Sequence, residues 1–159
     1  MTVPVIVICG ATATGKSDLA VALARKIDGE IINADSMQLY KGMDIGTAKL
    51  TFEERGGITH HLIDRLEITE EASVALYQVE ARAIIDGATK PMVIVGGTGL
   101  YIKSIIDELN FPDTDPQVRD RLSKEGEERG AKVMHERLSK LDPAAAQAIP
   151  MENLRRVVQ

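Results

Sequence analysis

The pattern G-x-x-x-x-G-K-S at residues 10–17 constrains the fold of this chain more than any other stretch. The β-branched apolar segment 3–9 before it indicates a buried parallel strand, and the segment 18–27 after it has apolar residues at helical spacing. A loop in this context turns backbone N–H groups toward one point at a helix N-terminus, where an anion is stabilised. The sequence therefore predicts a diphosphate or polyphosphate site in which Lys16 reaches the outer phosphates and the Ser17 hydroxyl ligates Mg²⁺.

Three strands are predicted, at residues 3–9, 30–34 and 92–95, with helical segments between them. This order predicts an α/β fold, a P-loop NTPase-like parallel sheet with flanking helices. A sheet of this kind usually has about five strands and needs helices on both faces. The sequence after residue 113 indicates only helices, so no later strand closes the second side of the first strand. We therefore expect the chain to be truncated, a part of a larger protein.

Two domains are predicted: residues 1–112 form an incomplete P-loop α/β core, and residues 113–159 form part of a helical insertion. Asp115 and Asp142 are predicted helix N-caps, because each precedes a proline that fits the first helical position. Ser73 is a predicted N-cap within the core. The charges of the helical segment are balanced, which is typical of a solvated helical hairpin.

The stretch between the second and third strands carries two local signals. Thr51 and Glu54 have capping-box spacing, which predicts one short helix. His60 and His61 are adjacent in an extended segment and point to opposite sides, which argues against a shared zinc ion.

Polar residues follow the second and third predicted strands. Asp35 comes directly after the second strand, followed by residues 36–38. Ligands collect at the carboxyl ends of parallel strands, so Asp35 is predicted to face the same crevice as the phosphate loop. The alternative is that Asp35 only caps a following turn. The third strand ends in the glycine-rich residues 96–99, which allow a close backbone approach or serve only as a tight turn, but a turn does not require Thr98.

Composition limits the partners. A net charge of −5 and an aromatic content of 3% give no sign of a nucleic-acid partner or of a base-stacking platform. Cys9, the single cysteine, is predicted to be a small buried residue of the first strand. No run approaches the roughly 18 apolar residues of a membrane span. We therefore expect a cytoplasmic protein with no membrane partner.

An ordered set of motifs indicates which kind of P-loop protein this sequence resembles. It comprises Gly-Ala-Thr-Ala-Thr-Gly-Lys-Ser at 10–17, Asp-Ser-Met-Gln at 35–38, Tyr-Lys-Gly-Met-Asp-Ile-Gly-Thr-Ala-Lys at 40–49, His-His-Leu-Ile-Asp at 60–64, Val-Gly-Gly-Thr-Gly-Leu-Tyr at 95–101, Asp-Pro-x-Val-Arg at 115–119, Asp-Pro-x-Ala-Ala at 142–146 and Asn-x-Arg-Arg-Val at 153–157. In this order the set resembles the tRNA dimethylallyltransferases (tRNA isopentenyltransferases). The resemblance runs through the whole chain and covers about the first half of a usual family member.

The resemblance implies transfer of a dimethylallyl group from dimethylallyl diphosphate to the exocyclic amine of an adenosine beside the tRNA anticodon. The leaving diphosphate would be held by Gly10, Ala11, Thr12, Ala13, Thr14, Gly15, Lys16 and Ser17, with Lys16 and Ser17 foremost. Mg²⁺ bound to the diphosphate would be ligated by Ser17. Asp35 would act as general base, and Ser36, Met37 and Gln38 would help to hold the base after its extrusion from the RNA. The tRNA anticodon stem-loop would also be contacted by Thr98, Arg119, Arg155 and Arg156. The basic residues of the helical segment would then be phosphate contacts.

Two alternatives stay open. A small-molecule kinase on the same sheet would bind ATP at the loop and use Asp35 as the base for a substrate hydroxyl. The second alternative is a folded fragment that binds the diphosphate and has no activity.

Overall fold

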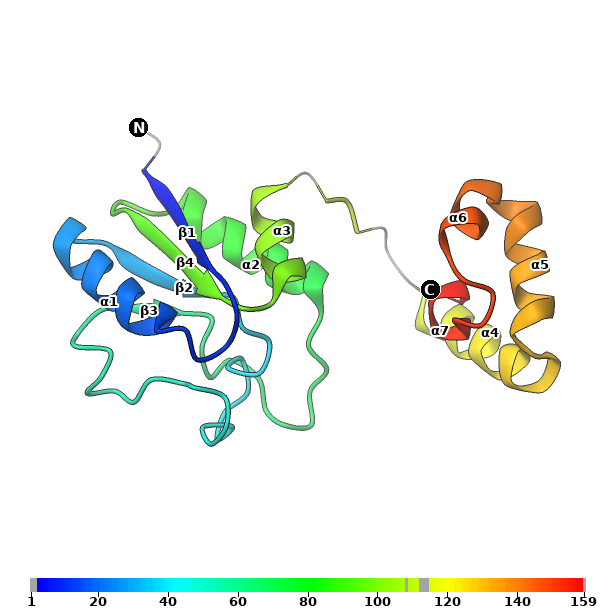
Figure 1. Ribbon diagram of the computed structural model, residues 1–159, viewed down its shortest axis with the longest axis horizontal. Helices are drawn as coiled ribbons and strands as arrows, with labels where there is room; N and C mark the ends of the chain where they lie inside the picture. Colours follow the sequence, from blue (N-terminus) through cyan, green and yellow to red (C-terminus); the bar gives the residue numbers. More distant parts are fainter. Residues whose placement is uncertain (1–2, 108, 112–114, 159) are drawn as a thin grey trace. The chain divides into compact units, whose positions relative to one another are not determined.

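The computed structural model describes residues 3–107, 109–111 and 115–158. The chain divides into two compact units, which we call the α/β unit (Met1–Asn110) and the helical unit (Phe111–Gln159). Figure 1 shows the sheet and three helices in the α/β unit and only helices in the helical unit. The domain boundary that the sequence predicts between residues 112 and 113 lies outside the described residues.

A parallel sheet organises the α/β unit. In chain order the unit contains β1 (Val5–Cys9), α1 (Lys16–Ile27), β2 (Glu30–Asn33), β3 (His60–His61), α2 (Val74–Asp86), β4 (Met92–Gly96) and α3 (Gly99–Ile106). The strand order is β1-β4-β2-β3, and every pairing is parallel. The predicted fold class is therefore confirmed. The two-residue strand β3 was not predicted, because its histidines lack the apolar pattern of a strand.

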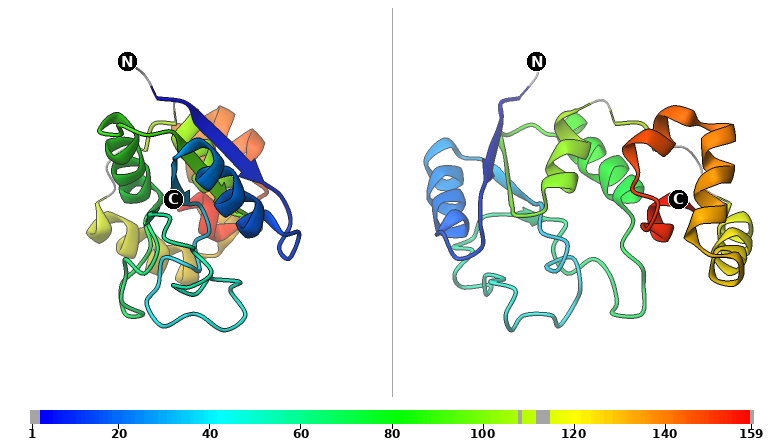
Figure 2. Two further views of the ribbon diagram at one scale, coloured as in Figure 1. Left: turned by 90° about the vertical axis from the view of Figure 1, so that its left-hand side faces the viewer. Right: turned by 45° about the vertical axis from the view of Figure 1, so that its right-hand side comes forward.

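Alternate residues of the central strands face two separate hydrophobic layers. Ile31 and Val93 pack in the layer formed with α1. Ile32 and Ile94 pack in the other layer, which includes residues of α2 and α3. The β2–β4 register places Ile31 beside Val93 and Ile32 beside Ile94, so each layer continues across both strands. Figure 2 shows the helices on the two faces of the sheet, and these layers fix the strand ends from which the site is built.

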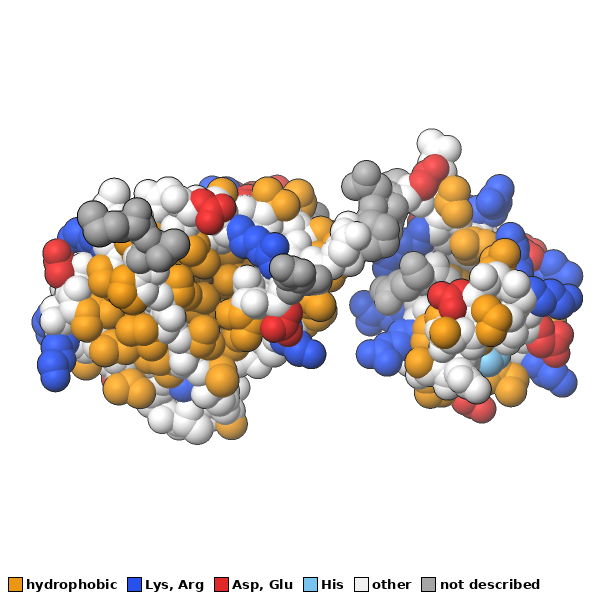
Figure 3. All heavy atoms as spheres, turned by 90° about the horizontal axis from the view of Figure 1, so that it is seen from above, with side chains coloured by type: hydrophobic (Ala, Val, Ile, Leu, Met, Phe, Trp, Pro, Cys, Tyr) orange, Lys and Arg blue, Asp and Glu red, His pale blue; other side chains and the backbone are white. Residues whose placement is uncertain are grey.

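The strand β1 lies at an edge of the sheet. Among the residues that the structure describes, β1 pairs with β4 alone. Val5 keeps 41% of its surface exposed, and Cys9 is exposed as well. The predictions of a buried first strand and of a buried Cys9 are therefore wrong, because one flank of β1 has no neighbouring strand in the described part of the chain. Figure 3 shows a face of the α/β unit on which hydrophobic side chains reach the surface.

The predicted short helix after Thr51 is a turn. Thr51 N–H donates to the Glu54 carboxylate at 2.8 Å, and Glu54 N–H donates to Thr51 Oγ1 at 3.3 Å. The reciprocal bonds of a capping box are thus present, and the backbone hydrogen bond to Thr51 lowers the pKa of Glu54. Gly56 and Gly57, both at positive φ, end the segment before a helix is established.

Three helix N-caps are confirmed. Ser73 Oγ accepts a hydrogen bond from the N–H of Leu76 in α2. Asp115 and Asp142 each accept from N–H groups in the first turn that follows, with proline at the first helical position. Of the described helices, none combines the length and the apolar character needed to cross a membrane.

The helical unit has its own small core. It contains α4 (Pro116–Arg129), α5 (Ala131–Leu141), α6 (Pro143–Ala148) and α7 (Leu154–Val157). Leu154 packs so closely on α4 that a Cβ at Gly126 would stand 2.7 Å from Leu154 Cδ1. His135 Nε2 bonds to the carbonyl oxygens of Ala146 at 3.0 Å and Ile149 at 2.9 Å, so α5 holds the end of α6.

Candidate active site

Two side chains of the loop at residues 10–17, which joins β1 to α1, donate hydrogen bonds to the same carbonyl oxygen within the loop. Thr14 Oγ1 donates to the Ala11 oxygen at 2.9 Å, and the Lys16 ammonium donates to the same oxygen. Gly15 has a φ of 77° and open space where a Cβ would stand, so its glycine is required by backbone conformation. The helix α1 begins at Lys16, two residues earlier than predicted, which places Lys16 and Ser17 in its first turn. Their N–H groups are therefore among those that a helix leaves free for an anion.

One pocket of about 510 Å³ collects residues from several parts of the α/β unit. Segments that leave the carboxyl ends of β1, β2 and β4 meet there, as expected for a ligand site of an open parallel sheet. The lining comprises Thr12, Ala13, Thr14, Gly15, Lys16, Ser17, Asp18, Asn33, Asp35, Gln38, Thr47, Ala48, Lys49, Leu50, Glu54, Val95 and Gly96.

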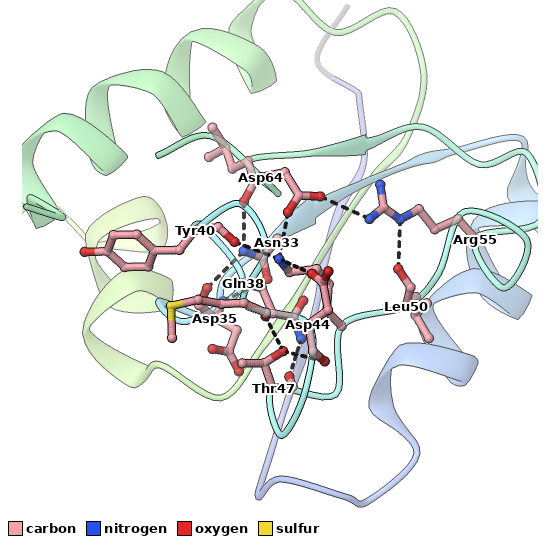
Figure 4. Close-up of polar contacts among 12 residues, drawn as sticks. Asn33, Asp35, Gln38, Tyr40, Asp44, Thr47, Leu50, Arg55 and Asp64 are labelled. Carbon is pink, nitrogen blue, oxygen red and sulfur yellow. Dashed lines mark hydrogen bonds and ion pairs between the residues drawn. The ribbon is translucent and has the colours of Figure 1, made fainter. Parts of the chain in front are cut away.

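The buried side chain of Asn33, at the end of β2, fixes Asp35 in this pocket (Figure 4). Its amide nitrogen donates to the Asp35 carbonyl at 3.0 Å and the Leu62 carbonyl at 2.8 Å, and its oxygen accepts from Asp35 N–H at 3.0 Å. Tyr77 of α2 donates to the Asn33 carbonyl at 2.8 Å, and burial raises the pKa of Tyr77, so the hydroxyl stays a neutral donor. Asp35 Oδ1 also accepts from Met37 N–H at 3.0 Å. The carboxylate thus caps a turn and lines the pocket at once.

The ends of β2 and β4 are joined through Thr98. Ser36 N–H donates to Thr98 Oγ1 at 3.1 Å, and Thr98 N–H donates to the Ala34 oxygen at 3.1 Å. The two backbones approach closely at Gly96, where a Cβ would stand 2.1 Å from the Ala34 oxygen. Gly99 has open space instead. Of the two roles left open for these glycines, Gly96 therefore serves a close backbone approach.

The predicted site residues fall into three groups. Those that line the pocket are Thr12, Ala13, Thr14, Gly15, Lys16, Ser17, Asp35 and Gln38. Those that belong to the same loops without lining it are Gly10, Ala11, Ser36, Met37 and Thr98. Arg119 of α4 and Arg155 and Arg156 of α7 are exposed on the helical unit, over which Figure 3 shows many Lys and Arg side chains.

Sequence reasoning missed several residues of the pocket wall, and three of them bear on how the site is held. Asn33 is one, and its signal was a polar residue at the end of an otherwise apolar strand. Thr47 and Lys49 are the others, in the segment 41–50 (the 41–50 loop), whose motif carried no predicted site residue. The Gln38 side chain donates to the Thr47 carbonyl at 2.9 Å, so this loop holds a predicted site residue.

The donor set suits a magnesium ion that is held mainly by its substrate. The pocket offers the Ser17 hydroxyl and the Asp18 carboxylate. Within the described residues there is no group of three or more His, Cys, Asp or Glu side chains that could hold a metal by themselves. Mg²⁺ commonly keeps several waters and binds through one or two protein oxygens plus phosphate oxygens, so these residues fit it.

The family follows from one comparison. The family model described as IPP transferase matches residues 38–159, which include Gln38, the 41–50 loop, the rest of the α/β unit after that loop and the helical unit. The chain belongs to the IPP transferase family.

Curated relatives support the family assignment along the length of the chain. It is 56% identical to the tRNA dimethylallyltransferase of Thermobifida fusca and 56% identical to that of Streptomyces griseus, covering in each case 98% of this chain and 51% of the relative. The chain thus spans about half the length of the curated relatives it matches. Both relatives are named tRNA dimethylallyltransferase, and neither is named as a kinase.

Solved structures agree with the fold. A tRNA isopentenylpyrophosphate transferase of Bacillus halodurans matches with a TM-score of 0.67 at 43% identity, covering 98% of this chain and 53% of that one. A eukaryotic dimethylallyltransferase, solved acting on tRNA, matches with a TM-score of 0.84 at 33% identity, covering 98% and 40%.

Proposed function

We propose that this chain provides the diphosphate and base sites of a tRNA dimethylallyltransferase. The enzyme would transfer a dimethylallyl group from dimethylallyl diphosphate to the exocyclic amine of an adenosine beside the anticodon. The observation that carries the proposal is that Lys16 and Asp35 line one pocket. That pocket pairs an anion site with a carboxylate that can accept a proton, which is what the transfer needs.

In the proposed step, the C–O bond between the allylic carbon and the diphosphate breaks, and the amine nitrogen bonds to that carbon. The diphosphate leaves with the electron pair, and Lys16 with the N–H groups of the loop stabilises its charge. Asp35 accepts the proton that the amine loses, because its Oδ2 is free of hydrogen bonds from the described residues while Oδ1 holds the turn. Mg²⁺, held by Ser17 and phosphate oxygens, would supply further neutralisation of the leaving group.

The α/β unit would hold the adenosine, and the helical unit would contact the RNA backbone. The pocket loops, with Ser36, Met37, Gln38 and Thr98, would hold the extruded adenosine. The exposed Arg119, Arg155 and Arg156 would contact RNA phosphates, which position the stem-loop without reading its sequence.

Replacing Lys16 with Ala tests the anion site directly. We expect dimethylallyl diphosphate with Mg²⁺ to bind about 10–100-fold more weakly, because the variant loses hydrogen bonds from a charged donor. Isothermal titration measures the change. Lys26→Ala is the matched control, since it removes an exposed lysine from the last turn of the same helix and should leave the affinity unchanged. Equal affinities of the wild type and Lys16→Ala would refute the anion site.

A transfer assay tests the whole proposal. The chain is incubated with an anticodon stem-loop and labelled dimethylallyl diphosphate, alone and as a chimera in which it replaces the matching half of the Thermobifida fusca relative. Label on the RNA is the expected result. ATP-dependent phosphorylation of a small alcohol without labelling would instead favour the kinase. Diphosphate binding with no transfer, even in the chimera, would leave only a binding function.

A further inference from the structure

A buried ammonium group lies in the wall of the pocket. Lys49 lines the pocket, yet its side chain is only 3% exposed. Its Nζ bonds to Asp44 Oδ1 at 2.8 Å, Asp64 Oδ1 at 2.7 Å and the Tyr40 carbonyl at 2.7 Å. An ammonium has three donors, and all three are used, which compensates the cost of burial. Burial alone would lower the pKa of Lys49, but hydrogen bonds to the two carboxylates outweigh it and raise the pKa, so the group stays charged.

These bonds tie three separate segments to one point. Tyr40 follows β2, Asp44 lies with Lys49 in the 41–50 loop, and Asp64 follows β3. Figure 4 shows Tyr40, Asp44 and Asp64 converging, with Arg55 reaching Asp64 from the other side at 3.4 Å. Two acidic and two basic groups therefore balance within this cluster.

The cluster holds Gln38 from two directions. The backbone N–H of Asp64 donates to the Gln38 carbonyl at 3.1 Å. The Gln38 side chain donates to the carbonyl of Thr47, two residues before Lys49. Both bonds depend on the placement of segments that the Lys49 ammonium joins.

The backbone around the cluster is strained. Ala48 has a φ of 52° and Asp64 a φ of 54°, in the left-handed region that non-glycine residues rarely adopt. Such conformations persist only where surrounding interactions hold them, and they concentrate at functional sites. The hydrogen bonds of Lys49, beside Ala48 and on Asp64, supply that constraint.

We propose that Lys49 is a positioning residue that holds Gln38 and the 41–50 loop in place to receive the extruded base. This inference rests on the proposed function. Lys49 acts through Gln38 and the loop, whereas the diphosphate is held by the separate loop at residues 10–17. Loss of the ammonium should therefore weaken recognition of the base and spare diphosphate binding.

The test compares Lys49→Met with Lys90→Met, an equal substitution of a lysine outside the 41–50 loop that is 46% exposed and pairs only with Asp28 among the described residues. Each variant is titrated with dimethylallyl diphosphate and Mg²⁺, then with two stem-loops that carry either the target adenosine or an abasic site at that position. The ratio of the two RNA affinities isolates base recognition, because phosphate contacts are common to both RNAs.

We expect Lys49→Met to lower this ratio by about tenfold, with diphosphate affinity within twofold of the wild type, and Lys90→Met to change neither. Lys49→Arg, which keeps the charge, should restore part of the ratio. If Lys49→Met does not fold, Asp44→Asn removes one partner of the ammonium and should lower the ratio in the same direction. An unchanged ratio, or equal losses for RNA and diphosphate, would overturn the positioning role while the proposed function stands. A wild-type chain that does not distinguish the two RNAs would overturn both.

Discussion

Replacing Asp35 with Ala is expected to lower the rate of dimethylallyl transfer by roughly 10²–10⁴-fold, the usual effect of losing a general base. Diphosphate binding should stay intact, because Asp35 lies after β2 and the anion is held by the loop after β1. The rate is measured in single-turnover transfer of label to the stem-loop by the chimera, and binding by titration.

The Ala variant also removes the hydrogen bond that Met37 N–H donates to Asp35 Oδ1, so it changes the turn as well as the base. Asp35→Asn separates the two effects, since its amide oxygen can still accept from Met37 while the amide cannot take a proton. A rate as low as that of Asp35→Ala is expected. An Asn variant as fast as the wild type would show that Asp35 only shapes the turn.

Replacing Gly96 with Ala is expected to lower the free energy of unfolding by roughly 3 kcal/mol. The new Cβ would stand 2.1 Å from the oxygen and 2.2 Å from the carbonyl carbon of Ala34. Both are backbone atoms of the segment that leads into Asp35, so no rotamer change relieves the contact. The ends of β2 and β4 would have to separate, and Asp35 would move with them. Urea unfolding followed by circular dichroism measures the loss.

Gly99→Ala is the matched control, three residues along the same glycine-rich segment. Among the described residues, no atom beyond its chain neighbours and its own helix backbone lies within 4 Å of the point where the new Cβ would stand. Gly99 is also the first residue of α3, where alanine is favourable. The stability of this variant should equal or slightly exceed that of the wild type. If the two alanine variants unfold at the same urea concentration, the approach of β4 to Ala34 is not as close as described.

The sequence predicts the framework because its signals are local. The pattern at residues 10–17, the apolar strands, and the N-caps Ser73, Asp115 and Asp142 each occupy a short window, and the structure confirms the strands and caps. Asp35 could be predicted in the same way, because its position after a parallel strand places it at the ligand edge.

The rest depends on contacts between distant residues. The burial of Cys9 was predicted wrongly, because an apolar segment does not reveal whether its strand is central or at an edge. Lys49 was missed because its partners lie at residues 40, 44 and 64, and only tertiary structure brings them together. The close approach of Gly96 to the Ala34 backbone could not be predicted either, because the glycine-rich sequence does not show which glycine meets another segment.

The edge position of β1 has a consequence for the anion site that it carries. The loop at residues 10–17 joins this edge strand, which has one hydrogen-bonded neighbour in the described part of the chain, to the helix α1. A diphosphate bound by the loop would stabilise β1 against local opening, because the loop continues directly from the end of this strand. The stability of the sheet edge would therefore depend on ligand occupancy. Amide hydrogen exchange at Val5–Cys9 should then slow on ligand addition more than exchange at the central strand Met92–Gly96.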